Sequence, residues 1–170
     1  METFDLVIYL LPIVFMLHEF EELVFLKPWL ERNKTWIGRK FPRFKKALAG
    51  TASLSPSAFA LIVAEEFILI SLATIAALVF HAYYPWLAVL LAFSLHAVVH
   101  LVQGLVLRRH VPVIATSVLS LAYGIWGFVI VSEVFSTGEI LSCLVLGTIF
   151  MAVNLWVMHR AAAAFDRARQ

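Results

Sequence analysis

The chain has 170 residues, of which 62% are hydrophobic and 14% charged, and it carries a formal net charge of +2. Soluble domains are roughly 45 to 50% apolar, so this composition, with a mean hydropathy of +0.93, excludes an ordinary soluble domain. It indicates an integral membrane protein. The basic residues follow the connections between apolar segments rather than forming a patch, which argues against nucleic-acid binding.

Five apolar segments approach the roughly 20 residues that a helix needs to span a bilayer. They are residues 4–26, 57–80, 86–107, 111–133 and 139–159. Pro28 predicts the end of the first helix, and Ser55 followed by Pro56 predicts an N-cap for the second. Pro85 and Pro112 open the third and fourth segments in the same way. We predict an all-α fold: one domain, residues 1–170, forming an integral membrane bundle of five transmembrane helices.

A basic amphipathic stretch lies between the first two segments. Its apolar residues, Ile37, Phe41, Phe44 and Leu48, recur at spacings of four, three and four, with Lys and Arg between them. This pattern predicts an interfacial helix on the membrane surface, kinked at Pro42. The helix would serve either to contact anionic lipid or to anchor the topology.

All thirteen Lys and Arg residues fall on one side of the predicted bundle. They lie between segments one and two, between segments three and four, and after segment five, within residues 27–46, 108–109 and 160–169. The positive-inside rule makes that side cytoplasmic, and an odd number of spans then places the N-terminus outside and the C-terminus in the cytoplasm.

Ionisable side chains cluster inside three of the predicted spans. They are His18, Glu21 and Glu22 in the first, Glu65 and Glu66 in the second, and His96 and His100 in the third. Each costs at least roughly 2.5 to 3.5 kcal/mol at mid-membrane, so the chain needs a compensating partner or a function for them. At the helical rise of about 1.5 Å per residue they come to a similar depth near the cytoplasmic side. The spans contain no Lys or Arg, so the carboxylates must be protonated, paired with histidine or bound to cations.

Helical spacing places the members of each cluster on one face. His18 and Glu22, like His96 and His100, are four residues apart. We predict that six residues bind metal: His18, Glu21, Glu22, Glu65, His96 and His100. Adjacent glutamates differ by about 100° in direction, so one of the second pair is expected to play another role, and Glu66 is the candidate catalytic base. Glu19, Gln103 and Asn154 are expected to support the ligands, or to form interhelical hydrogen bonds, which average about 0.6 kcal/mol in membranes.

The run HEFEE, residues 18–22, near the end of a first membrane helix resembles the signature of the HXXEE family of small integral membrane proteins. The chain length, the later acidic pair, the run HAVVH at residues 96–100 and the segment after Pro112 are also similar. The family is functionally uncharacterised. The resemblance therefore implies functional roles for His18, Glu21 and Glu22 without implying a reaction.

Several intramembrane chemistries do not fit this sequence. A site-two-type protease needs HExxH, whereas HAVVH has Ala97 in place of the glutamate, and membrane desaturases resemble one another in carrying about eight histidines, against six here. A mixed histidine and carboxylate site suits one or two divalent ions, Zn, Fe or Mn, and a dinuclear centre is the preferred interpretation.

The predicted function is a metalloenzyme, hydrolytic or oxidative, acting on a lipidic or small hydrophobic substrate. The alternative is a divalent-metal or proton-coupled transporter that uses the same cluster. The outer halves of the spans contain almost no ionisable groups, which favours the enzyme. The sequence predicts no particular oligomeric state.

Overall fold

The computed structural model describes residues 2–42, 54–108 and 111–169, and the regular structure in these ranges is helical. The elements in chain order are α1 (Thr3–Glu21), the π-helical turn η1 (Glu22–Leu26), α2 (Lys27–Lys40), α4 (Pro56–Phe80), α5 (Tyr83–Leu107), α6 (Ile114–Ser132) and α7 (Thr137–Ala168). Five helices, counting residues 3–40 as one, are long and apolar enough to cross a membrane. The predicted all-α class is confirmed, and so are five helices long and apolar enough to span a membrane.

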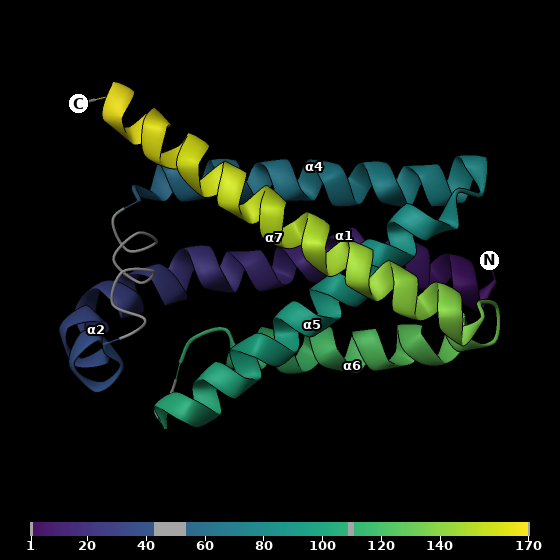
Figure 1. The fold of residues 1–170 in the computed structure, drawn as a ribbon, viewed down its shortest axis with the longest axis horizontal. Helices are drawn as coiled ribbons and strands as arrows, with labels where there is room; N and C mark the ends of the chain where they lie inside the picture. Colours follow the sequence, from purple (N-terminus) through teal and green to yellow (C-terminus); the bar gives the residue numbers. More distant parts are fainter. Residues whose placement is uncertain (1, 43–53, 109–110, 170) are drawn as a thin grey trace.

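The spans run back and forth between two ends of the bundle (Figure 1). The N-terminus lies at one end, together with the α4–α5 and α6–α7 connections, and the C-terminus lies at the other. We call the second end the basic end, because α2, Arg108 and the last turns of α7 bring the described Lys and Arg residues there.

The first helix does not stop at Pro28 as predicted, but continues through η1 and α2 to Lys40. Proline lacks an N–H group, and an α-helical interior would lose a hydrogen bond there. The π-helical turn just before it changes the pairing, since the Lys27 N–H donates to the carbonyl of Glu22, five residues back. Pro28 then sits in the first turn of α2, where the missing donor is tolerated.

This continuous helix changes the expected amphipathic segment. Ile37, which we placed on a separate surface helix, is buried on α2 and is 3% exposed. Residues 37–40 belong to the continuous first helix, so the predicted separate helix does not begin at Ile37. Residues 43–48 of the predicted segment lie outside the described residues, and an interfacial helix there stays a prediction.

Helix α7 extends nine residues past the predicted end at 159, to Ala168. Its last turns lie along the start of α4, where Ala162 is buried with Leu54, Ala58 and Ile62. The backbone N–H of Ser55 donates to a carboxylate oxygen of Asp166 at 2.7 Å, and the Ser55 hydroxyl donates to the other oxygen. This contact between distant parts of the chain holds the helix beyond its apolar segment.

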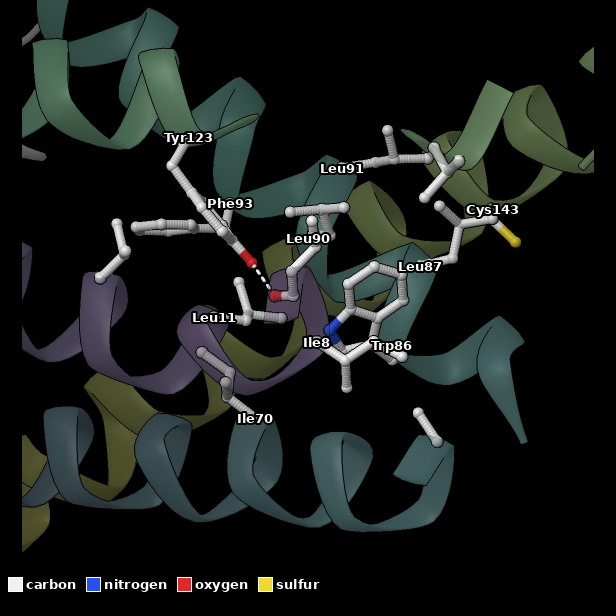
Figure 2. Close-up of a cluster of buried hydrophobic side chains, with 14 of the residues drawn as sticks. Ile8, Leu11, Ile70, Trp86, Leu87, Leu90, Leu91, Phe93, Tyr123 and Cys143 are labelled. Atoms are coloured by element: carbon white, nitrogen blue, oxygen red, sulfur yellow. Dashed lines mark hydrogen bonds between the residues drawn. The ribbon is translucent and has the colours of Figure 1, made fainter. Parts of the chain in front are cut away.

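A packed apolar core fills the half of the bundle away from the basic end (Figure 2). It combines α1, α4, α5, α6 and α7, and its fully buried members include Ile8, Leu11, Trp86, Leu87 and Leu90. The Tyr123 hydroxyl donates to the carbonyl of Val7 at 2.6 Å, the dashed line in Figure 2. This half of the molecule is therefore closed by close-packed side chains.

Glycine lets α5 and α7 approach closely. A Cβ on Gly147 would overlap the carbonyl group of Ala88, a backbone group that cannot rotate away. Small residues at such crossings are the usual way for membrane helices to pack. Figure 1 shows that α5 and α7 cross and then diverge toward the basic end. The two helix axes thus separate on the basic side of this contact.

The Gly147 contact predicts a stability difference between two glycines of one helix. Gly147→Ala should lower the thermal midpoint of the detergent-purified protein, because overpacking costs roughly 1 to 3 kcal/mol. Gly138→Ala is the matched control, since nothing lies within 4 Å of a Cβ there. Gly147 lies in the helix interior, where alanine gains up to about 1 kcal/mol of helix propensity, and Gly138 in the first turn gains no more than that, so a lower midpoint for Gly147→Ala than for Gly138→Ala is due to the clash. Equal melting of the two variants would contradict the close crossing.

Candidate metal centre

Four ionisable side chains converge between α1, η1 and α5. His18, Glu22, His96 and His100 each offer one ligand atom, and these atoms all lie within 4.8 Å of one another. Glu22 Oε1 lies 2.7 Å from Nε2 of His100 and 3.6 Å from Nε2 of both His18 and His96. The Nε2 atoms of His96 and His100 are 2.9 Å apart. We call these four residues the His/Glu group.

These separations are of the size that one small metal ion requires. With metal–nitrogen distances of about 2.0 to 2.1 Å, tetrahedral ligands lie roughly 3.3 to 3.4 Å from each other. Four of the six separations, 2.7 to 3.6 Å, fall on both sides of that value, and all six are within 4.8 Å. The His/Glu group could therefore hold a metal ion after its side chains adjust to the ligand distances.

The His/Glu group is largely removed from solvent. His18 is fully buried, Glu22 and His100 are 8% and 6% exposed, and the His96 side chain, at 35%, is the most exposed of the four. The three carboxylate–histidine contacts within 4 Å found among the described residues all join Glu22 to a histidine. The partners of this buried carboxylate are thus imidazoles rather than Lys or Arg side chains, as predicted from the absence of Lys and Arg in the spans.

Thr116 on α6 determines which nitrogen of His18 faces the His/Glu group. The Thr116 hydroxyl donates its single proton to Glu21 Oε2, and the Thr116 backbone N–H donates to the same oxygen at 3.0 Å. The hydroxyl oxygen lies 3.1 Å from His18 Nδ1, so it accepts a hydrogen bond from the Nδ1–H group. His18 Nε2 is then the unprotonated nitrogen, with its lone pair available to a metal.

Glu21, predicted as a ligand, therefore lies outside the His/Glu group and acts on it through Thr116. Glu65, also predicted as a ligand, lies outside it too, because its Oε2 accepts a hydrogen bond from Asn154 Nδ2 at 2.9 Å. Asn154 thus supports a glutamate on the α4–α7 contact rather than a residue of the group.

A cavity of about 670 Å³ adjoins the His/Glu group. Its polar lining includes Glu22, His96 and His100 together with Glu19 and Glu66, which are only 5% and 6% exposed. Among the described residues Glu66 Oε1 has no hydrogen-bond partner. Of the adjacent pair on α4, the structure therefore turns Glu66 to the cavity and Glu65 to α7.

Two further residues lining the cavity, neither of them a sequence candidate, are His159 on α7 and Trp29 on α2. His159 Nδ1 donates to the carbonyl of Leu155 at 2.8 Å, which leaves Nε2 as an acceptor. The local sequence pattern does not predict either residue, because its position in the cavity wall depends on how its helix packs against the others. Gln103, a predicted supporting residue, also lines the cavity.

The remainder of the cavity lining is apolar and comes from α1, η1, α2, α4, α5 and α7 and from two residues outside the helices. It consists of Phe15, Leu26, Leu30, Ile37, Phe41, Phe59, Ile62, Val63, Phe93, Val98, Val99, Val102, Val106, Leu107, Val111, Met151 and Leu155. A few polar groups in an otherwise apolar, concave wall are typical of sites for small ligands.

Residues 9–127 match the family described as proteins of unknown function with an HXXEE motif. No curated protein and no solved structure matches the chain. The structure gives each motif residue a distinct position: His18 and Glu22 contribute to the His/Glu group, and Glu21 orients His18 through Thr116. Because the match covers most of its length, the chain belongs to the HXXEE family.

Proposed function

We propose that the protein is a membrane metalloenzyme that binds a divalent ion at the His/Glu group and acts on a lipidic or small hydrophobic substrate in the adjoining cavity. The observation that carries this proposal is the convergence of four ligand atoms within 4.8 Å at the wall of an apolar cavity. Three imidazoles and a carboxylate suit Zn, Fe or Mn. When bound, such an ion would act as a Lewis acid toward a substrate oxygen or a water molecule.

The geometry favours one ion at the His/Glu group. The dinuclear centre that we predicted counted on Glu21 and Glu65, whose oxygens accept hydrogen bonds from Thr116 and Asn154. A second ion would instead require Glu19 and Glu66, the two remaining buried carboxylates of the cavity wall.

Glu66 is the proposed general base. It lies on α4, a different helix from the four residues of the His/Glu group, and its free Oε1 can accept a proton from a hydroxyl or water in the cavity. This role keeps the base within the same cavity without occupying a ligand position.

The packing beyond the site supports an enzyme rather than a carrier. The His18 ring contacts the Phe93 ring, with centroids 5.8 Å apart, and Phe93 packs on Phe15 at 5.6 Å. Phe15 and Phe93 are each 2% exposed, and the fully buried Leu11 and Leu90 belong to the same core. A site closed on this side can be reached only through the half of the bundle that contains the basic end. We place that end in the cytoplasm by the positive-inside rule, with the N-terminus outside.

Metal content tests the proposed ligands. Purified wild-type protein should contain near-stoichiometric Zn, Fe or Mn by elemental analysis, and Glu22→Ala and His100→Ala should each lose most of it, because each removes a ligand. Glu65→Gln is the matched control, since Glu65 is a membrane glutamate bonded to Asn154. Unchanged metal content in monodisperse Glu22→Ala and His100→Ala would refute the site.

The Thr116 contact predicts a graded effect on affinity. Thr116→Val removes the hydroxyl that orients His18, and such supporting contacts typically change metal affinity by about 10- to 100-fold. Thr116→Ser keeps the hydroxyl and should remain close to wild type. Chelator competition measures both affinities, and a similar loss in the two variants would show that the hydroxyl has no such role.

Liposome reconstitution separates the enzyme from the transporter. The closed core predicts that metal-loaded wild-type protein gives no more Zn²⁺ or Mn²⁺ flux than the Glu22→Ala variant, while it retains its own metal. Flux that is abolished by His18→Ala and Glu22→Ala would instead establish transport.

A further inference from the structure

Building on the proposed function, we propose that the substrate is a single-chain lipid with a small uncharged polar group at one end, and that it enters from the bilayer between α5 and α7 with this group first. The proposal depends on the distribution of polar side chains along the cavity, on the opening of its wall and on its size.

The cavity is elongated along the helices, and its carboxylates and the His/Glu group gather at one end, with the uncharged Gln103 and His159 toward the other. Its lining on α5 extends from Phe93 to Leu107, fifteen residues that rise roughly 21 Å along the α-helix. His96 and His100 lie in the inner part, next to the packed core, whereas Val106 and Leu107 lie toward the basic end.

The first span and α4 follow the same order. On the first span Glu19 and Glu22 precede Trp29 and Ile37, and on α4 Glu66 lies further from the basic end than Phe59. On α7 the neutral polar side chain of His159 lies nearer the basic end than Met151 and Leu155, so it is the carboxylates and the His/Glu group that mark the inner end. A lipid bound in this cavity would therefore have its polar end inside and its apolar chain toward the basic end, opposite to a phospholipid in the adjoining leaflet.

The inferred entrance from the bilayer lies between α5 and α7, both of which line the cavity. The two helices touch at Ala88 and Gly147 and diverge toward the basic end (Figure 1). Met151 and Leu155, which line the cavity, are four and eight residues past Gly147 on that side.

The opposing edge of this opening is a row of valines on α5. Val98, Val99, Val102 and Val106 line the cavity and are nevertheless 37%, 45%, 50% and 52% exposed. A side chain that lines a cavity and is also exposed on an apolar helix surface marks a lateral entrance. An apolar molecule can thus pass from the bilayer to the His/Glu group without crossing water.

Size and charge restrict the polar group. A volume of about 670 Å³ lies within the roughly 300 to 1,000 Å³ of sites for one small ligand. The described residues that line the cavity include Glu19, Glu22 and Glu66 and no Lys or Arg. A phosphate group would find no Lys or Arg side chain of the kind that usually binds it, and its only cationic partner would be the proposed metal ion, whose charge Glu22 already partly balances. A hydroxyl or carbonyl group has no such requirement.

Trp29 provides the probe for the orientation, because it lines the cavity on the basic side of the polar end. Two brominated hexadecanols would be titrated onto the detergent-purified protein, one with bromine at the methyl end and one with bromine beside the hydroxyl. The contribution of Trp29 is obtained by subtracting the tryptophan emission of the Trp29→Phe variant from that of the wild-type protein. We expect saturable quenching of this component by the methyl-end isomer, relieved by excess hexadecanol, and weak quenching by the other isomer.

The reverse order of the two isomers would overturn the polar-end-first orientation. Equal quenching that hexadecanol does not relieve would mean partitioning into detergent and would overturn the binding site. Saturable quenching by phosphatidylcholine brominated at its chain ends, equal to that of the alcohol, would overturn the small-head-group conclusion.

Two identical substitutions on α4 test the location. Val63→Phe places a larger ring in the cavity and should weaken hexadecanol binding by about tenfold or more, or roughly 1.4 kcal/mol. Val79→Phe, at a 62% exposed position near the other end of the helix, should leave it unchanged. Equal affinities in the two variants would remove the cavity as the site.

The metal content of the same preparations is measured in parallel. Bound metal without saturable quenching would refute the lipid inference and leave the metal site standing. Saturable quenching in a protein without metal would refute the metal site and leave the lipid inference standing.

Discussion

The structure depends on how a carboxylate is accommodated inside a membrane bundle that offers it no Lys or Arg. Glu22 is 8% exposed, and three histidines surround its Oε1 within 3.6 Å. An unpaired carboxylate at this position would be strongly unfavourable, and removing any one partner leaves the others uncompensated. The arrangement ties the end of α1 to α5. A divalent ion among the same four atoms would supply the positive charge that neutral imidazoles do not.

The two glutamates at the end of the HEFEE run show how adjacent residues can serve one site from different sides. They differ by about 100° around the helix, so Glu22 faces α5 while Glu21 faces α6. Glu65 and Glu66 repeat this division, one bonded to α7 and the other facing the cavity. In both pairs one carboxylate accepts a hydrogen bond from another helix, and the adjacent one faces the cavity.

Hydrophobic length and spacing predict a large part of this architecture, because the bilayer requires long apolar helices and an i, i+4 pair must share a face. They predict the five spans and the facing of His18 with Glu22 and of His96 with His100. They do not predict the continuation past Pro28, which depends on a π-helical turn, or the extension of α7, which depends on Ser55 and Asp166.

The assignment of individual glutamates required the structure for a related reason. Which member of an adjacent pair points inward depends on the rotation of its helix, and that rotation is determined by contacts between helices. Gly147 against Ala88 and Tyr123 against Val7 are contacts of this kind, and neither is visible in local spacing. The role of Thr116, ninety-five residues from Glu21, has the same origin.

The two halves of the bundle make different contributions that depend on each other. The packed core holds α5 against α1, α4 and α7 and so lets the second half remain hollow without losing its geometry. Trp29, Leu30 and Ile37 of α2 form the cavity wall on the basic side, so apolar side chains separate the His/Glu group from the aqueous end. Electrostatic interactions are stronger where water is excluded, which favours both tight retention of an ion and the polarisation of a bound oxygen. The continuation of the first span beyond Pro28 is therefore part of the site, because it carries the residues that cover the cavity.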